Sequence, residues 1–172
     1  AEVYERQPLE YREGVLPSAQ IAIARNGKIA AMRSFGRVLH QGVEPPATAE
    51  PLSCVFSSTK AITSAAAWLL IQDGVLDVGA RVADLIPEFG ENGKHEVTIE
   101  QLFTHTAGFP QAPFVPSQFL DRGKRLERFA SWRLNWKPGE RFEYHPSSSV
   151  YVIAELIERL SGASFGDFVR KQ

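Results

Sequence analysis

The dipeptide Asn26-Gly27 is the feature that most constrains the fold of this chain. It lies between two short stretches, residues 20–25 and 28–35, of which the first alternates apolar and polar side chains. Asn and Gly readily adopt the backbone angles of a tight two-residue turn, so the pair predicts an antiparallel hairpin. A two-stranded hairpin is marginal alone and normally belongs to a larger sheet. The fold must therefore combine antiparallel sheet with the structure of the remaining chain.

Helical patterns dominate that remainder. Residues 37–54 carry one Gly and three Pro residues and predict a long loop. After it, a strongly apolar helix is expected from about residue 57 to 72. Shorter helices are expected after the capping box at residues 98–101, over 117–130, over 150–160 and from Ser164 onward. The basic residues of 117–130 are interpreted as a solvated face: Arg122, Lys124, Arg125 and Arg128. The last helix shows an apolar face that no later element covers: Phe165, Phe168 and Val169.

Composition limits the classes of function. The chain has 172 residues, of which 44% are hydrophobic and 23% charged, which is typical of one globular domain. A net charge of −1 gives no electrostatic case for binding nucleic acid. The longest apolar run, near residues 61–71, is too short to span a bilayer. The compartment stays open between cytoplasm and periplasm or secretion.

No metal or cofactor site is predicted. The four histidines never occur three or four positions apart, and the single cysteine is not paired with one of them. No glycine-rich phosphate-binding loop occurs. The sequence therefore gives no reason to expect a metal, a nucleotide or a nucleic acid as a partner.

Ser57 and Lys60 form the first candidate catalytic pair. Positions three apart lie on the same helical face, so Lys60 would reach the Ser57 hydroxyl. An amine can take a proton from this otherwise weak nucleophile, although chance alone produces such a spacing in many chains. A second motif, Gly-x-Ser-x-Gly around Ser164, matches a nucleophile elbow, but that elbow needs a strand before the serine. Here a helix precedes Ser164, so the residue is better interpreted as a helix cap.

Tyr144 is a third candidate, in a loop just before a helix start. Its phenol normally titrates near pH 10. A neighbouring ammonium would favour the phenolate and make it a usable base. The alternative is an ordinary half-buried tyrosine, and the residue alone does not decide between the two.

The order of these motifs resembles the serine beta-lactamase and penicillin-binding-protein superfamily, specifically its class C-like branch of esterases, peptidases and beta-lactamases. Similarity extends over roughly residues 15–172. Five features match in order: Leu16-Pro17 with the Asn26-Gly27 hairpin, Ser57-Ser58-Thr59-Lys60, Asp73-Gly74-Val75-Leu76-Asp77, residues 98–108 with the sequence TIEQLFTHTAG, and residues 138–144 with the sequence PGERFEY.

The resemblance implies an α/β (α+β) fold in which helices flank an antiparallel sheet, together with a helical subdomain. Residues 1–172 would be the N-terminal portion of one catalytic domain, with the hairpin and entry loop in 15–56 and a mostly helical region in 57–172. Ser57 would be the acylated nucleophile and its backbone N–H an oxyanion donor. Lys60 and Tyr144 would move protons, His145 would contact substrate, and His105 would be structural.

Two departures from the family pattern shape the expected function. The family's Tyr-x-Asn is Tyr144-His145-Pro146 here, and proline has no donor, which favours an ester over a beta-lactam. A Lys-Thr-Gly or His-x-Gly motif does not follow Tyr144, so the C-terminal sheet strands are expected on polypeptide outside this chain, which a second chain would carry. The resemblance implies a small-molecule ester or amide as the substrate, and the leading hypothesis is a serine hydrolase that acts through an acyl-enzyme on carboxylic esters. The alternatives are a beta-lactamase or D-amino-acid peptidase, and a non-catalytic binding or sensor domain.

Overall fold

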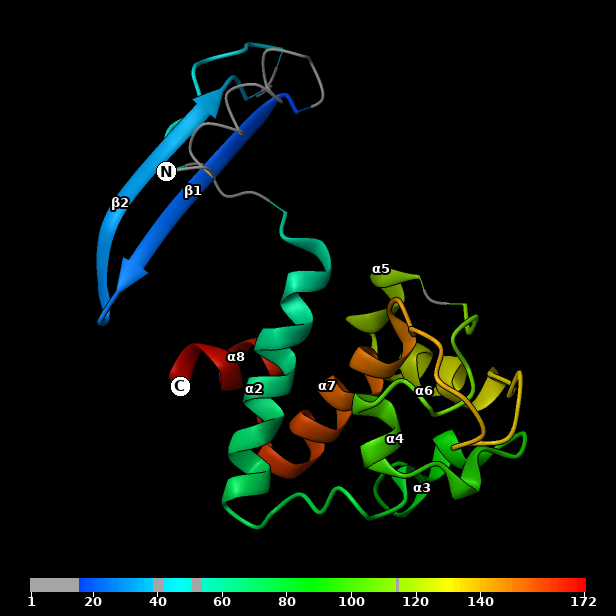
Figure 1. Cartoon of the computed structure of the whole chain (residues 1–172). Helices are drawn as coiled ribbons and strands as arrows, with labels where there is room; N and C mark the ends of the chain where they lie inside the picture. Colours follow the sequence, from blue (N-terminus) through cyan, green and yellow to red (C-terminus); the bar gives the residue numbers. More distant parts are fainter. Residues whose placement is uncertain (1–15, 39–41, 51–53, 114) are drawn as a thin grey trace. The chain divides into compact units, whose positions relative to one another are not determined.

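The computed structural model describes residues 16–38, 42–50, 54–113 and 115–172. The chain divides into two compact units, Ala1–Cys54 and Val55–Gln172. In its described part the first unit contains a two-stranded antiparallel sheet, and the second is built from helices (Figure 1). The fold class is thus mixed α and β, as the sequence predicts.

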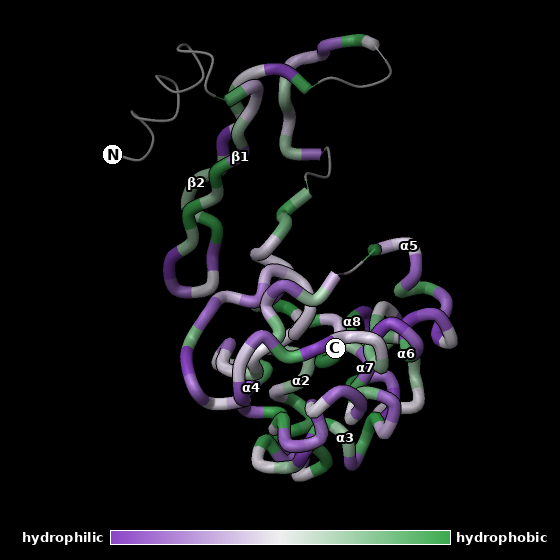
Figure 2. Tube along the Cα trace, turned by 90° about the vertical axis from the view of Figure 1, so that its right-hand side faces the viewer, coloured by the Kyte–Doolittle hydropathy of each residue, from purple (hydrophilic) through white to green (hydrophobic). Residues whose placement is uncertain are grey.

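The hairpin consists of β1 (Ser18–Arg25) and β2 (Lys28–Gly36), paired antiparallel. Asn26 and Gly27 both have positive φ, 53° and 72°, as the predicted two-residue turn requires. Hydrophobic residues occur along both strands (Figure 2), and large ones are exposed, with Ile29 at 65% and Met32 at 54%. Within the described residues no third strand pairs with β1 or β2.

Helix α7 (Ser148–Ser161) is the centre of the helical unit. Three other helices pack against it: α2 (Thr59–Gln72), α4 (Ile99–Phe103) and α8 (Phe165–Lys171) (Figure 1). Most of α7 is inaccessible to solvent, because apolar side chains surround it on several sides. The largest fully buried side chains of the unit include Phe89, Phe109, Phe129 and Trp132.

Short elements complete the unit: η1 (Phe56–Ser58), α3 (Val82–Leu85), η2 (Pro87–Gly90), η3 (Lys94–Glu96), α5 (Pro116–Phe119) and α6 (Arg122–Ser131). The predicted capping box is present, since the Thr98 side chain accepts from the Gln101 N–H and the Gln101 side chain accepts from the Thr98 N–H. Gly162 ends α7 in the left-handed conformation and Ser164 caps α8. The interpretation of Ser164 as a cap is therefore confirmed.

Two expectations about the last third of the chain are wrong. Residues 117–130 are not one helix, because Asp121 takes an extended conformation and caps α6 through the Lys124 N–H. Arg125 does not belong to a solvated face, since it is 3% exposed. The apolar face of α8 does not depend on a later element, because Phe165, Phe168 and Val169 are partly buried against the core formed by earlier parts of the helical unit.

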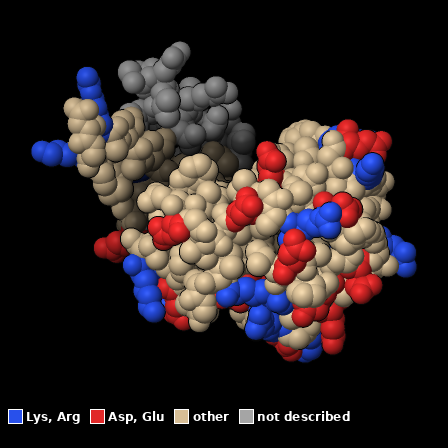
Figure 3. All heavy atoms as spheres, turned by 90° about the horizontal axis from the view of Figure 1, so that it is seen from below, with Lys and Arg blue, Asp and Glu red and all other residues tan. Residues whose placement is uncertain are grey.

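Acidic and basic side chains are interspersed on the surface. In the view of Figure 3 both signs alternate over the helical unit without a large patch of either, which agrees with the net charge of −1. Among the helices described, none is both long and apolar enough to cross a membrane.

Candidate active site

Ser57 lies in a tight turn that leads into α2. The preceding residue, Phe56, has a φ of 42°, an uncommon conformation for a residue that is not glycine. Such backbone strain costs about 1–3 kcal/mol and is concentrated at functional sites. The residues at the N-caps of η1 and α2 are Val55 and Ser58, and neither makes a side-chain capping bond. Ser57 therefore lies at a helix start, and neither cap side chain forms a hydrogen bond with the Ser57 N–H.

Two polar side chains converge on the Ser57 hydroxyl. Lys60 Nζ donates a hydrogen bond to Ser57 Oγ at 3.0 Å. The Tyr144 hydroxyl is hydrogen-bonded to the same oxygen at 2.9 Å, although Tyr144 is 87 positions away in sequence. Lys60 Nζ also lies 5.0 Å from the centroid of the Tyr144 ring. The structure thus brings together the three residues that the sequence analysis singles out as catalytic.

The environment of Tyr144 favours its ionised form. Hydrogen bonding by the Lys60 ammonium lowers the pKa of Tyr144, and the Ser57 hydrogen bond and the positive charge of Lys60 act in the same direction. A phenolate next to Ser57 Oγ can accept the serine proton. The arrangement is therefore chemically suited to activating a serine.

Two histidines brace the segment that carries Tyr144. His145 Nε2 accepts from the Phe109 N–H at 3.1 Å, so Nδ1 carries the proton and donates to the Glu143 carbonyl at 2.6 Å. His105 Nδ1 accepts from the His145 N–H at 3.1 Å, and the His105 and Tyr144 ring centroids are 4.8 Å apart. Burial lowers the pKa of both histidines, which keeps both rings in the neutral form that these bonds require.

The position of His145 does not fit its predicted role as a residue that contacts substrate. Its side chain is fully buried, and both ring nitrogens are engaged by the backbone. It therefore presents no free donor or acceptor to a substrate in the described structure. The contacts of His105 are those of the structural residue that the sequence analysis expects.

A cleft of about 360 Å³ opens beside Ser57. Its lining is mainly apolar and comes from η1, α2, α5, α7 and α8, and it includes Phe119, Val150, Tyr151, Ala154 and Phe165. Sequence reasoning did not connect Phe119 or Phe165 with the site, since only the tertiary fold brings them to Ser57. Among the described residues, no group of three or more His, Cys, Asp or Glu side chains is arranged to hold a metal ion.

Comparison with known proteins places this geometry in context. The family model described as Beta-lactamase matches residues 4–172. Protein flp of Staphylococcus aureus (strain MW2) is 28% identical over 169 residues, which are 93% of this chain and 33% of that protein.

Solved structures share the fold over nearly the whole chain. A penicillin-binding protein homologue from Caulobacter crescentus superposes with a TM-score of 0.83 and 28% identity, covering 99% of this chain and 46% of that one. A family VIII carboxylesterase superposes with a TM-score of 0.82 and 27% identity, covering 98% and 46%. The chain thus spans about half the length of these two proteins and has the fold of that half.

Proposed function

Because the chain belongs to the Beta-lactamase family, whose model matches residues 4–172, we propose that the protein is a serine hydrolase that acts through an acyl-enzyme on carboxylic esters. One observation carries the proposal. Ser57 Oγ is hydrogen-bonded at once to Lys60 Nζ, at 3.0 Å, and to the Tyr144 hydroxyl, at 2.9 Å. A nucleophile in contact with a cation and a lowered-pKa phenol is the arrangement that covalent catalysis requires.

In the proposed reaction, Ser57 Oγ attacks the ester carbonyl carbon while the Tyr144 phenolate takes its proton. The Ser57 N–H at the helix start receives the developing oxyanion, as oxyanion holes do in acyl transfer. The bond to the leaving oxygen then breaks, and the alcohol departs with the proton from Tyr144. Water attacks the acyl-enzyme with Tyr144 again accepting a proton, which passes to Ser57 Oγ as the carboxylic acid leaves. The Lys60 ammonium stabilises the phenolate throughout.

An ester is favoured over an amide or beta-lactam by the residues that follow Tyr144. Pro146 lines the cleft and has no N–H to offer a substrate amide, while the His145 ring beside it is buried. Similarity to a family VIII carboxylesterase supports the same choice. The similarity to a penicillin-binding protein homologue favours beta-lactam or peptide recognition as the second candidate.

We further propose that additional polypeptide completes the site, either as a continuation or as a second chain. The exposed apolar residues of the hairpin, Ile29 and Met32 among them, suit an antiparallel sheet with more strands. The chain also covers only 46% of the two solved structures named above. The polypeptide that carries the family's Lys-Thr-Gly or His-x-Gly motif would supply a second oxyanion donor and another wall of the site.

The decisive test is Ser57→Ala in the full-length protein. Because this change removes the nucleophile, we expect hydrolysis of a chromogenic ester to fall by roughly 10³-fold or more, and labelling by a fluorophosphonate to disappear. Ser164→Ala is the matched control, since Ser164 caps α8, and it should retain activity and labelling.

Three results would contradict the proposal or redirect it. Labelling that persists in Ser57→Ala and is lost in Ser164→Ala would overturn the assignment of the nucleophile. Nitrocefin turnover well above ester turnover would favour the beta-lactamase candidate. A stoichiometric adduct without turnover, seen by mass spectrometry, would indicate a sensor domain instead of an enzyme.

A further inference from the structure

We propose that a buried ion cluster, formed by Arg125 of α6 with Glu155 and Glu158 of α7, positions the aromatic walls of the cleft and thereby sets which acyl group the enzyme accepts. The inference rests on the proposed function, because it concerns the group that Ser57 would carry. The three residues are positioning residues: they act through Phe119 and Phe165, which line the cleft with Ser57.

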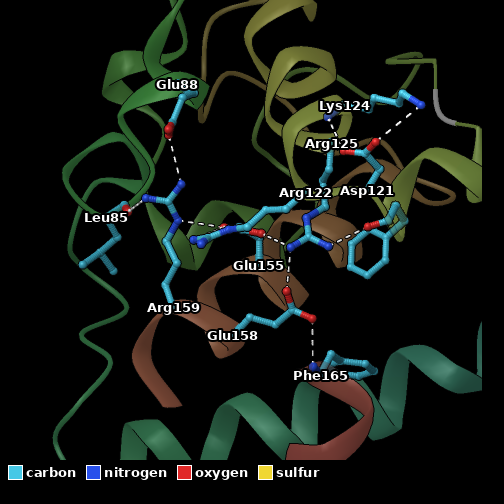
Figure 4. Close-up of polar contacts among 11 residues, drawn as sticks. Leu85, Glu88, Asp121, Arg122, Lys124, Arg125, Glu155, Glu158, Arg159 and Phe165 are labelled. Atoms are coloured by element: carbon cyan, nitrogen blue, oxygen red, sulfur yellow. Dashed lines mark hydrogen bonds and ion pairs between the residues drawn. The ribbon is translucent and has the colours of Figure 1, made fainter. Parts of the chain in front are cut away.

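The cluster is closed to solvent at its centre. The Glu155 side chain is fully buried and that of Arg125 is 4% exposed, and the two form an ion pair. Arg125 Nη2 also lies 2.6 Å from Glu158 Oε2. Figure 4 shows these side chains meeting between α6 and α7, with Arg122 and Arg159 on the other side of Glu155. Their nitrogens lie 3.1 Å and 2.8 Å from Glu155 Oε1.

Glu155 is held in its charged form by this surrounding. Burial favours the neutral carboxyl, but hydrogen bonds from Arg159, Arg125 and Arg122 and the charge of Arg125 lower the pKa of Glu155. A buried ion pair is weak evidence for stability, because taking charges out of water offsets the attraction between them. The ion pairs alone therefore do not explain the cluster, and its contacts with the cleft residues Phe119 and Phe165 indicate its role.

The cluster contacts two aromatic residues that line the cleft, Phe119 through Arg125 and Phe165 through Glu158. Arg125 Nη1 donates to the Phe119 carbonyl at 2.6 Å, and the Arg125 guanidinium lies 4.4 Å from the centroid of the Phe119 ring. Glu158 Oε1 accepts from the Phe165 N–H at 2.8 Å (Figure 4). The polar contacts thus fix the backbone of both phenylalanines, and the Arg125 side chain also covers one ring.

Such support matters because the walls stand on short helices. Helix α5 has four residues and α8 has seven, and helices of this length are marginal without tertiary contacts. The Phe119 ring packs against Tyr151 of α7, with 4.8 Å between ring centroids. The ion cluster therefore determines how far Phe119 and Phe165 stand from the central helix.

The acyl group is the part of the substrate that these walls would select. It remains bonded to Ser57 Oγ after the alcohol leaves, so the space beside Ser57 must hold it. A largely apolar cleft of about 360 Å³ suits an aliphatic chain of medium length. In an apolar pocket one methylene changes kcat/KM by about 10-fold to 200-fold, so a small shift of a wall alters the preferred length.

The test compares Arg125→Lys with Arg159→Lys in the full-length protein. Lysine keeps the charge at residue 125, but it lacks the fork that lets arginine reach Glu155, Glu158 and Phe119 together. Arg159 is the matched control, because its other contacts are the Leu85 carbonyl and Glu88, away from the cleft. Both substitutions disturb the buried Glu155 carboxylate, but only the substitution of Arg125 also removes a contact with a residue of the cleft, Phe119.

The readout is kcat/KM for p-nitrophenyl esters from acetate to decanoate. We expect Arg125→Lys to lower the value for the best wild-type acyl chain by about tenfold or more, with acetate changed by no more than about twofold because it does not reach the walls. Arg159→Lys should keep the wild-type order of preference. Equal losses for all esters in Arg125→Lys, or a shifted preference in both variants, would overturn the inference.

A second pair of variants covers the case in which Arg125→Lys does not fold. Glu158→Ala removes the acceptor of the Phe165 N–H and should change the preferred acyl length, whereas Glu158→Gln keeps a carbonyl oxygen there and should restore it. Identical profiles for these two variants and the wild type would refute the positioning role while Ser57-dependent hydrolysis stands. If the wild-type protein shows no ester hydrolysis that depends on Ser57, the proposed function is refuted, and this inference is refuted with it.

Discussion

At the scale of single residues, the proposed role of Tyr144 as the base for Ser57 depends on its contact with Lys60. A free tyrosine with a pKa near 10 would be almost entirely protonated at neutral pH and would be a poor base. The Lys60 ammonium, which hydrogen-bonds to the phenol oxygen, lowers the pKa of Tyr144. Each step down in that pKa raises the fraction of phenolate available to Ser57.

The pH dependence of the reaction tests this role. Loss of the Tyr144 proton activates the base, so kcat/KM should rise with pH and reach half its maximum below pH 10, because the pKa of Tyr144 is lowered. Tyr144→Phe should remove this rise and lower kcat/KM by about 10²- to 10⁴-fold. The pH–rate profile of both proteins is the measurement. A profile of Tyr144→Phe that keeps the wild-type rise would show that another group is the base.

At the scale of elements, the loop of residues 104–110 is hydrogen-bonded to the segment of residues 135–145 that carries Tyr144. Backbone bonds join them at intervals: the Asn135 N–H donates to the Gly108 carbonyl at 2.7 Å, and the Glu143 N–H donates to the His105 carbonyl at 3.1 Å. His145 adds the bond to Phe109. These hydrogen bonds connect the two segments, so Tyr144 is supported by a loop that does not line the cleft.

At Gly108 the two hydrogen-bonded segments lie so close together that no side chain fits. Its φ is 90°, and a Cβ there would lie 2.5 Å from the Trp136 carbonyl oxygen. Gly108→Ala should destabilise the protein by at least about 1–3 kcal/mol and lower kcat, because Tyr144 would shift. Gly166 in α8 is the control: it has open space around its Cβ position, so Gly166→Ala should be neutral or stabilising by up to about 1 kcal/mol. Thermal unfolding measures both, and equal effects would contradict this account.

At the scale of the whole molecule, the sequence predicts the features that depend only on residues close together in the chain. The Asn26-Gly27 turn, the capping box at Thr98 and the Ser57–Lys60 spacing each follow from residues close in sequence, and the structure contains all three. Tyr144 is different. It lies 87 positions from Ser57, and only the resemblance to a family linked the two.

Local sequence patterns do not predict the surroundings of residues whose partners are distant in the chain. Arg125 has the spacing of an exposed helical position, but Glu155 and Glu158 lie 30 and 33 positions further along the chain, and no local pattern reveals them. The same holds for the core that covers Phe165 on α8. Asp121 is a local signal for the break between α5 and α6, because an aspartate at this position can cap the following helix through the Lys124 N–H.

The hairpin leads to the broadest prediction, which concerns residues 1–172 by themselves. Ile29 and Met32 are more than half exposed on a sheet that has two strands in its described part. Exposed apolar strands promote association, and an acyl-transfer site with one oxyanion donor loses much of its transition-state stabilisation. We therefore expect residues 1–172 alone to aggregate or to lack ester hydrolysis, and activity to appear when polypeptide with the remaining strands is supplied. Size-exclusion chromatography and a chromogenic ester assay check both points. A soluble, monomeric and active protein of residues 1–172 would show that the hairpin needs no further strands and that Ser57, Lys60 and Tyr144 suffice.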